Sequence, residues 1–302
     1  SFGKSIWSES GRSPSIHDTV VSAGSGSDWA IQVDGSGTIS NNTIAACGYG
    51  IHSGGASGVI SGNRLSGIAN QAVSVYGGQV SGNHVMNAVY AIRQGTAADP
   101  IYSGNRFTNI TYHVIRVEGT LGADFVWDDI QGMGWPYLIV ADVTVPSGRK
   151  LTIDPGIVVK FQAVDDYTDN KWVDRYRNDL FVDGTLNLLG TAERKVVFTS
   201  SRDDLYGGDA DGAGGVPGAG NWGSIKYTNP ANVLHDAVVR YGGLGRQYRY
   251  ESGGWKTAYY DTQMVWLAGS GAGAVEVRDC VLERSFGKSI WSESGRSPSI
   301  HD

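Results

Sequence analysis

The clearest pattern along the chain is a six-residue unit of apolar and polar positions that recurs in its first third. The unit reads apolar, small, Gly or Asn, Asn, variable, apolar, so apolar residues flank a short polar turn. It occurs at residues 39–44, 60–65, 80–85 and 102–107, and its fourth-position Asn recurs after 21, 20 and 22 residues. A repeat of this length with short strands and no helical pattern predicts a β-solenoid.

In such a fold each unit belongs to one rung of about 20 to 24 residues. A rung cannot bury its apolar face alone, so the rungs stack and their strands form long parallel sheets. We therefore expect an all-β parallel β-helix, with roughly 10 to 12 rungs over most of this chain.

The recurring Asn has a mechanical explanation. Backbone groups at the corner of a rung point inward, and a stacked amide side chain can satisfy them and pair with its neighbours above and below. Two further stretches fit the pattern with Asp in place of Asn, and one more is a candidate. We predict a structural ladder of Asp18, Asn42, Asn63, Asn83, Asn105, Asp236 and Asp279. A catalytic row of these residues is the alternative.

A second repeat is much longer. Residues 285–302 repeat residues 1–18 letter for letter, and the two segments begin 284 residues apart. This duplicated segment predicts tandem units with a period of 284 residues. Residues 1–130 would then be the C-terminal part of one unit and residues 131–302 the N-terminal part of the next. A cloning duplication and a circular permutation are the alternatives.

The Ser-Gly-Asn rungs resemble the right-handed parallel β-helix superfamily that includes pectate lyases. Residues 143–161 are similar to the opening rungs of β-helix domains in large secreted bacterial surface proteins. The likeness continues at residues 180–186, 196–200, 221–225 and 237–243. The resemblance implies a right-handed helix and an extracellular or cell-surface location. The family's motifs are specific for the fold and poor for activity.

The densest acidic cluster is a candidate calcium site. Carboxylates at close spacing, with Gly residues that permit tight turns, suit Ca²⁺, which takes several oxygen ligands. The candidate ligands are Asp203, Asp204, Asp209 and Asp211. The alternative is a solvated Asp-Gly turn between rungs.

An aromatic-rich stretch follows the acidic cluster. Exposed rings with polar neighbours can stack on sugars or form a protein contact. The candidate residues are Tyr248, Tyr250, Trp255, Tyr259, Tyr260 and Trp266. The alternative is a long loop packed against the solenoid.

Charge and motifs narrow the function. A net charge of −6 disfavours nucleic acid as a partner, and no apolar run is long enough to span a membrane. The NTD, GHG and RIK segments of the related hydrolases do not occur. We expect a structural or adhesive rod or fibre whose partners are copies of itself, with polysaccharide as a second candidate partner. The alternatives are a polysaccharide lyase or hydrolase and a non-catalytic carbohydrate-binding β-helix.

Overall fold

A computed structural model describes residues 5–22, 26, 28–163, 177–244, 262–268, 275–295 and 297–302. It shows an all-β parallel β-solenoid of about 11 turns, as the short repeat predicts. The chain divides into two compact units, which are described separately. Unit 1 comprises residues 1–125 and 129–136, and unit 2 comprises residues 126–128 and 137–302.

Among its described residues, unit 1 contains thirteen strands and one short 3-10 helix, η1. The elements are β1 (Ile6–Ser8), β2 (Ser15–His17), β3 (Val20–Ser22), β4 (Trp29–Val33), β5 (Thr38–Ser40), β6 (Thr43–Cys47), β7 (Tyr49–Ser53), β8 (Val59–Ser61), β9 (Arg64–Val75), β10 (Gln79–Ser81), β11 (His84–Gln94), β12 (Ile101–Ser103), β13 (Arg106–Thr120) and η1 (Ile130–Gly132).

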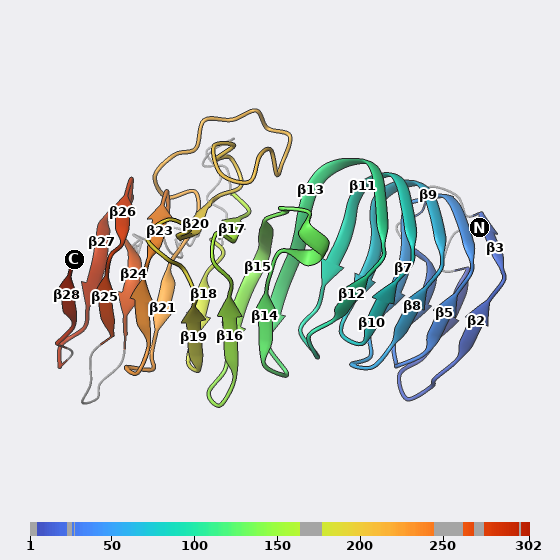
Figure 1. The fold of residues 1–302 in the computed structure, drawn as a ribbon, viewed down its shortest axis with the longest axis horizontal. Helices are drawn as coiled ribbons and strands as arrows, with labels where there is room; N and C mark the ends of the chain where they lie inside the picture. The colour runs from blue at the N-terminus through green and yellow to red at the C-terminus, as the bar shows by residue number, and fades with distance from the viewer. Residues whose placement is uncertain are drawn as a thin grey trace, which may run out of the picture. The chain divides into compact units, whose positions relative to one another are not determined.

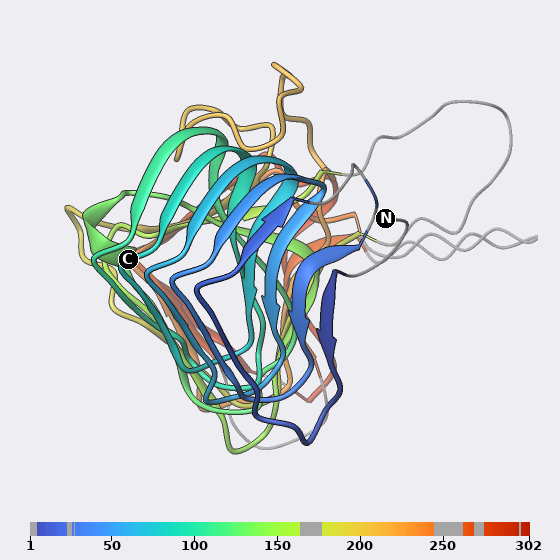
Figure 2. The ribbon, with the colours of Figure 1, turned by 90° about the vertical axis from the view of Figure 1, so that its right-hand side faces the viewer.

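Each turn of unit 1 contains three strand segments that pair in parallel with those of the next turn. The short strands form one sheet in the order β2, β5, β8, β10 and β12. A second stack contains β3, β6 and the first halves of β9, β11 and β13. A third stack contains β4, β7 and the second halves of the same three long strands. The turns are stacked one behind another with closely similar outlines (Figures 1 and 2).

The apolar positions of the six-residue unit form the core of unit 1. Ile39 and Ile60 are in register on neighbouring short strands, and both are fully buried. Ile44 and Leu65 form a second buried row at the other end of the unit. Burial of one such side chain contributes about 1.5–3 kcal/mol, so the stacked rows are the main source of stability.

Unit 2 repeats this parallel stacking with fourteen strands in the part of it that the structure describes, and β14 (Phe125–Trp127) lies where the chain passes from one unit to the other. The strands are β15 (Tyr137–Val145), β16 (Lys150–Ile153), β17 (Val158–Phe161), β18 (Leu180–Val182), β19 (Thr185–Leu188), β20 (Val196–Ser200), β21 (Ile225–Tyr227), β22 (Val233–His235), β23 (Ala237–Arg240), β24 (Gln263–Leu267), β25 (Glu276–Arg278), β26 (Val281–Glu283), β27 (Lys288–Ser292) and β28 (Ser299–His301).

The strands of unit 2 also form three parallel sets. One set contains β15, β17, β20, β23 and β26. A second contains β15, β18, β21, β24 and β27. The third is interrupted, because β16 pairs with β19 whereas β22 pairs with β25 and β28.

Candidate functional site

A column of amide side chains runs through unit 1 at the corner that follows each short strand. Nδ2 of Asn63 donates to Oδ1 of Asn83 at 2.9 Å and to the carbonyl oxygen of Ile39 at 2.8 Å. Oδ1 of Asn63 accepts the side-chain and backbone N–H groups of Asn42, both at 2.9 Å. One buried amide thus satisfies backbone groups of two rungs. The same contacts recur at Asn42, Asn83 and Asn105.

The column extends to two residues that the predicted ladder did not name. Gln131, in η1, accepts the side-chain N–H of Asn105 at 2.9 Å through Oε1. The backbone N–H of Thr19 donates to Oδ1 of Asn42 at 3.0 Å. Gln131 follows Asn105 after 26 residues and lies outside any six-residue unit, so the spacing gave no signal for it.

The predicted acidic members of the ladder have a different place. The pairing of β2 with β5 aligns Asp18 with Asn41, one residue before the amide column. Asp18, Asp236 and Asp279 have left-handed backbones, with φ of 53°, 43° and 53°. Asp and Asn are among the few residues that adopt this conformation readily. Each carboxylate contacts the basic side chain before it, namely His17, His235 and Arg278.

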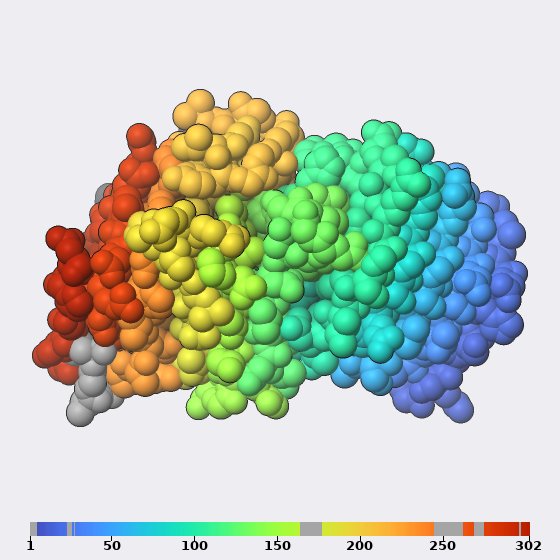
Figure 3. All heavy atoms as spheres, viewed as in Figure 1, coloured from blue at the N-terminus to red at the C-terminus, as the bar shows by residue number. Residues whose placement is uncertain are grey.

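The four acidic residues of the candidate calcium site lie on a loop after β20, and this loop projects as the golden segment of Figures 1 and 3. Asp203 is buried, and its Oδ2 accepts a hydrogen bond from Thr199 Oγ1 at 2.6 Å. Asp211 accepts one from Ser201 Oγ at 2.6 Å. Asp209 accepts backbone N–H groups of its own loop. Burial, followed by repulsion from Asp209, raises the pKa of Asp204.

The ammonium group of a lysine on a neighbouring strand reaches into the same loop. Lys160, on β17, is fully buried, and its Nζ donates to the carbonyl oxygens of Gly208 and, at 3.1 Å, Asp203. Burial lowers the pKa of Lys160, against the attraction of the four nearby carboxylates. The loop therefore contains a cation of the protein's own. Within the described residues no group of three or more His, Cys, Asp or Glu side chains could hold a metal ion, and calcium binding stays a prediction.

Arg240 joins the loop to the sheet beside Lys160. Its Nε lies 3.5 Å from Oδ2 of Asp203 and 3.2 Å from Oε1 of Glu283. Burial disfavours the charge, but a hydrogen bond to Tyr241 and the two carboxylates outweigh it and raise the pKa of Arg240. Arg240 thus connects Asp203 on the loop with Glu283 on β26, an arrangement that suits a clamp that holds the loop on the sheet.

Five of the six candidate contact residues, Tyr248, Tyr250, Trp255, Tyr259 and Tyr260, lie outside the described residues. The sixth, Trp266 on β24, packs between rungs. Its ring lies 5.5 Å from that of Trp291 and 3.7 Å from Nζ of Lys226. Its Nε1 donates to Glu293 at 2.9 Å.

Sequence reasoning missed a row of aromatic side chains on unit 1. Trp29 and Tyr49 have ring centroids 5.0 Å apart, and Tyr90 and Tyr112 have centroids 5.1 Å apart. Asn70 lies between the two pairs in sequence and donates to the hydroxyl of Tyr49 at 2.7 Å. The rings are half-buried, and a polar column runs alongside them: Gln32, His52, Ser74, Arg93 and Arg116. The available signal was the recurrence of aromatic residues at corresponding places in neighbouring rungs, interrupted at the rung of Asn70.

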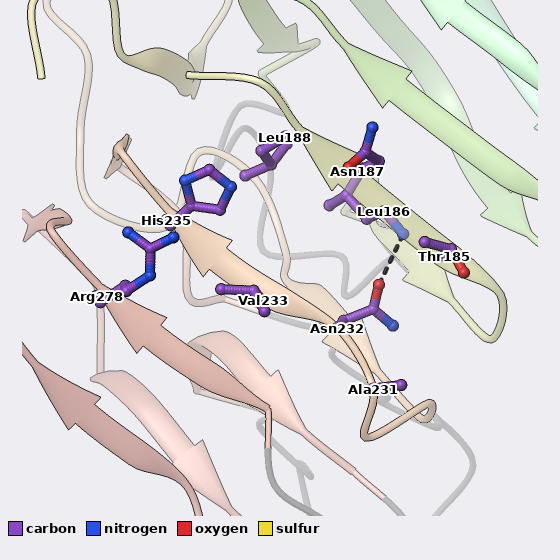
Figure 4. A pocket seen from close by; sticks show the side chains of 9 residues that line it. All are labelled: Thr185, Leu186, Asn187, Leu188, Ala231, Asn232, Val233, His235 and Arg278. Carbon is purple, nitrogen blue, oxygen red and sulfur yellow. Dashed lines mark hydrogen bonds between the residues drawn. The ribbon is translucent and has the colours of Figure 1, made fainter. Parts of the chain in front are cut away.

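A pocket of about 190 Å³ lies where the third strand set of unit 2 is interrupted (Figure 4). Asn232 bridges the interruption, because its Oδ1 accepts the N–H of Leu186 at 2.7 Å and its Nδ2 donates to the carbonyl oxygen of Gly184 at 3.0 Å. His235 and Arg278 also line the pocket, and both contact carboxylates outside its lining. The pocket can accept a small polar group, and its polar lining also serves the strand connection.

The described part of the chain contains no helix with the length and apolarity of a membrane-spanning segment. No family model matches the chain, and comparisons with curated proteins and with solved structures gave no match either. The structure shows the solenoid, while the likeness to pectate lyases and an origin in bacterial surface proteins stay predictions.

Proposed function

We propose that this chain is a structural module of a rigid extracellular rod or fibre, in which copies follow one another in tandem. The observation that supports this most directly is the continuous amide column from Asn42 to Gln131. Buried polar networks that are fully satisfied make a structure rigid. Each amide also ties one rung to the next, so the same contacts resist separation of the rungs along the stack.

The extracellular setting, the right-handed winding and the tandem arrangement are parts of the same proposal. The first two rest on the resemblance of residues 143–161 and the Ser-Gly-Asn rungs to β-helix domains of secreted proteins. The tandem arrangement rests on the duplicated segment, residues 1–18 and 285–302. A scaffold role also agrees with the Lys160 and Arg240 clusters, whose charges hold a loop on a sheet.

Electron microscopy of the native material tests this proposal. Rungs stack about 4.8 Å apart, so a continuous solenoid should show an axial repeat of about 50–58 Å. Filaments with that repeat would support the rod. Discrete short particles in native material would contradict it.

Carbohydrate binding is the second candidate function, and the aromatic row on unit 1 favours it. Sugar rings stack on aromatic faces, and the partly exposed His52 and Arg93 beside the row offer polar groups for hydroxyls. Affinity electrophoresis against a panel of polysaccharides tests this function. Tyr90→Ala should weaken retention roughly tenfold, the equivalent of about 1.4 kcal/mol. Phe286→Ala, at a half-exposed ring in unit 2, is the matched control and should change nothing.

A further inference from the structure

The duplicated segment occupies two different positions in the structure. In its N-terminal copy, Ile6, Trp7 and Ser8 pair with Ile31, Gln32 and Val33 of the following rung. In its C-terminal copy, the same three residues are numbered 290–292, and they pair with Val265, Trp266 and Leu267 of the preceding rung. The second strand of the segment behaves in the same way, because β2 pairs with β5 and β28 pairs with β25.

We infer that one copy of this segment forms a shared rung between successive tandem repeats of the chain. Strands β24 and β25 of one repeat would pair with one edge of this rung, and β4 and β5 of the next repeat with its other edge. This inference rests on the proposed function and specifies the partner of each end as a second copy of this chain. Unit 2 of one copy would meet unit 1 of the next through these 18 residues.

The backbone hydrogen bonds that flank the paired strands use different groups in the two positions. In the C-terminal copy, the N–H groups of Lys288 and Glu293 donate to Thr262 and Leu267 of the preceding rung. In the N-terminal copy, the carbonyl oxygen of Ser8 accepts the N–H of Asp34 from the following rung at 2.9 Å. A strand in a parallel sheet has two such edges, so one segment can make both sets of bonds at once.

The outward side chains also continue across the shared rung. Nε1 of Trp266 donates to Glu293, at 2.9 Å, and Nε1 of Trp7 donates to Asp34, at 2.8 Å. Each bond joins a Trp to an acidic residue 27 positions later. Because Trp291 is the repeat of Trp7, a shared rung would accept the first bond through its Glu and donate the second through its Trp.

The inward side chain of the segment lacks full cover in the C-terminal copy. Ile300 is 57% exposed, whereas its neighbour Val277, which has a rung on each side, is 2% exposed. In the N-terminal copy the same side chain is Ile16, which lies in register with the fully buried Ile39 and is itself half-buried. Asn42 also donates to the carbonyl oxygen of Ile16 at 3.0 Å, so the amide column reaches the segment from the following rung.

Hydrogen exchange in a lengthened chain tests the shared rung. A chain in which residues 19–302 are repeated after residue 302 has three copies of the segment, and only the middle copy has a rung on each side. Ser294→Ala in the middle copy, at an exposed position, makes its peptides distinguishable by mass spectrometry. The amides of its first strand should exchange about 100-fold more slowly than those of the last copy.

Two outcomes would overturn the inference in different ways. Fast amide exchange in the middle copy, with slow exchange in the rungs around Asn63, would contradict the shared rung and leave the proposal of a rigid module intact. Fast amide exchange in the rungs around Asn63 as well would contradict both the shared rung and the rigid module. Ile300→Asn, made separately in the middle and in the last copy, gives a matched pair of variants. In the middle copy it should abolish the slower amide exchange, and in the last copy it should leave amide exchange in the other rungs unchanged.

Discussion

At the scale of single residues, the solenoid meets one problem with two kinds of side chain. Turns between strands leave backbone groups that face the interior or a covered surface, and each must find a partner. In unit 1 the partner is the amide of an asparagine such as Asn63. In unit 2 the ammonium of Lys160 and the amide of Asn232 do comparable work for carbonyl groups of adjoining loops. Polar residues that look like candidates for chemistry thus serve the backbone.

Asn63→Ala should lower the free energy of unfolding by about 3 kcal/mol or more. The side chains of Asn42 and Asn83 each lose their hydrogen bond to Asn63, and the carbonyl oxygen of Ile39 loses its donor. Each buried group left unsatisfied costs about 1–3 kcal/mol. Urea unfolding measures the change. Asn109→Gly is the matched control, because it removes an exposed amide and keeps a residue suited to φ of 53°. An equal loss in both variants would contradict the ladder's role.

Lys160 should give the protein a pH dependence in the alkaline range. Burial holds the pKa of Lys160 below its ordinary value of 10.5, so between these two values the unfolded chain binds more protons than the folded protein. Stability attributable to this group therefore rises as the pH rises through that window. The difference in unfolding free energy between the native protein and Lys160→Met should increase as the pH rises towards 10.5. Lys150→Met, at an exposed lysine, should follow the native profile.

At the scale of elements, the rungs differ in length because their strands contain irregularities. The register between β9 and β11 shifts between Ala88 and Tyr90, where Gln71 of β9 stands opposite Tyr90. Before this point Ile68 pairs with Ala88, and after it Val73 pairs with Ile92. The extra residue of β9 is thus taken up where the chain changes sheets, and the inward rows on either side remain aligned.

Deletion of Ala69, an exposed residue between the paired Ile68 and Gln71, should be tolerated with a loss of about 1–2 kcal/mol, because β9 then matches β11 residue for residue and its inward rows stay in place. Deletion of Ser74 is the matched control. It lies between the inward Val73 and Val75, so its loss would turn Val75 outward and cost about 1.5–3 kcal/mol for that side chain alone. Urea unfolding separates the two, and equal losses would contradict the irregularity between Ile68 and Gln71.

The sequence predicted the solenoid because its period is carried by residues with strict requirements. Asn at the corner and Gly or Asn before it recur at nearly constant spacing, as at Gly62 and Asn63. The place of Asp18 could not be read in the same way, because Asp fits both the amide position and the left-handed position before it. The contacts of Lys160 were also out of reach, since they join residues 43 and 48 positions apart.

At the scale of the whole molecule, a solenoid is coupled chiefly between neighbouring rungs, so damage should spread only a short way. Asn63→Ala should accelerate hydrogen exchange most in β6, β9 and β11, whose rungs share its side-chain bonds, and least in β20 and β23 of unit 2. The physical reason is that each rung's stability depends on its own contacts and on those of its two neighbours. Exchange measured by mass spectrometry, peptide by peptide, would show this gradient. Equal acceleration in both units would mean that they open together as one cooperative body, and a module of that kind would transmit a local defect along the entire rod.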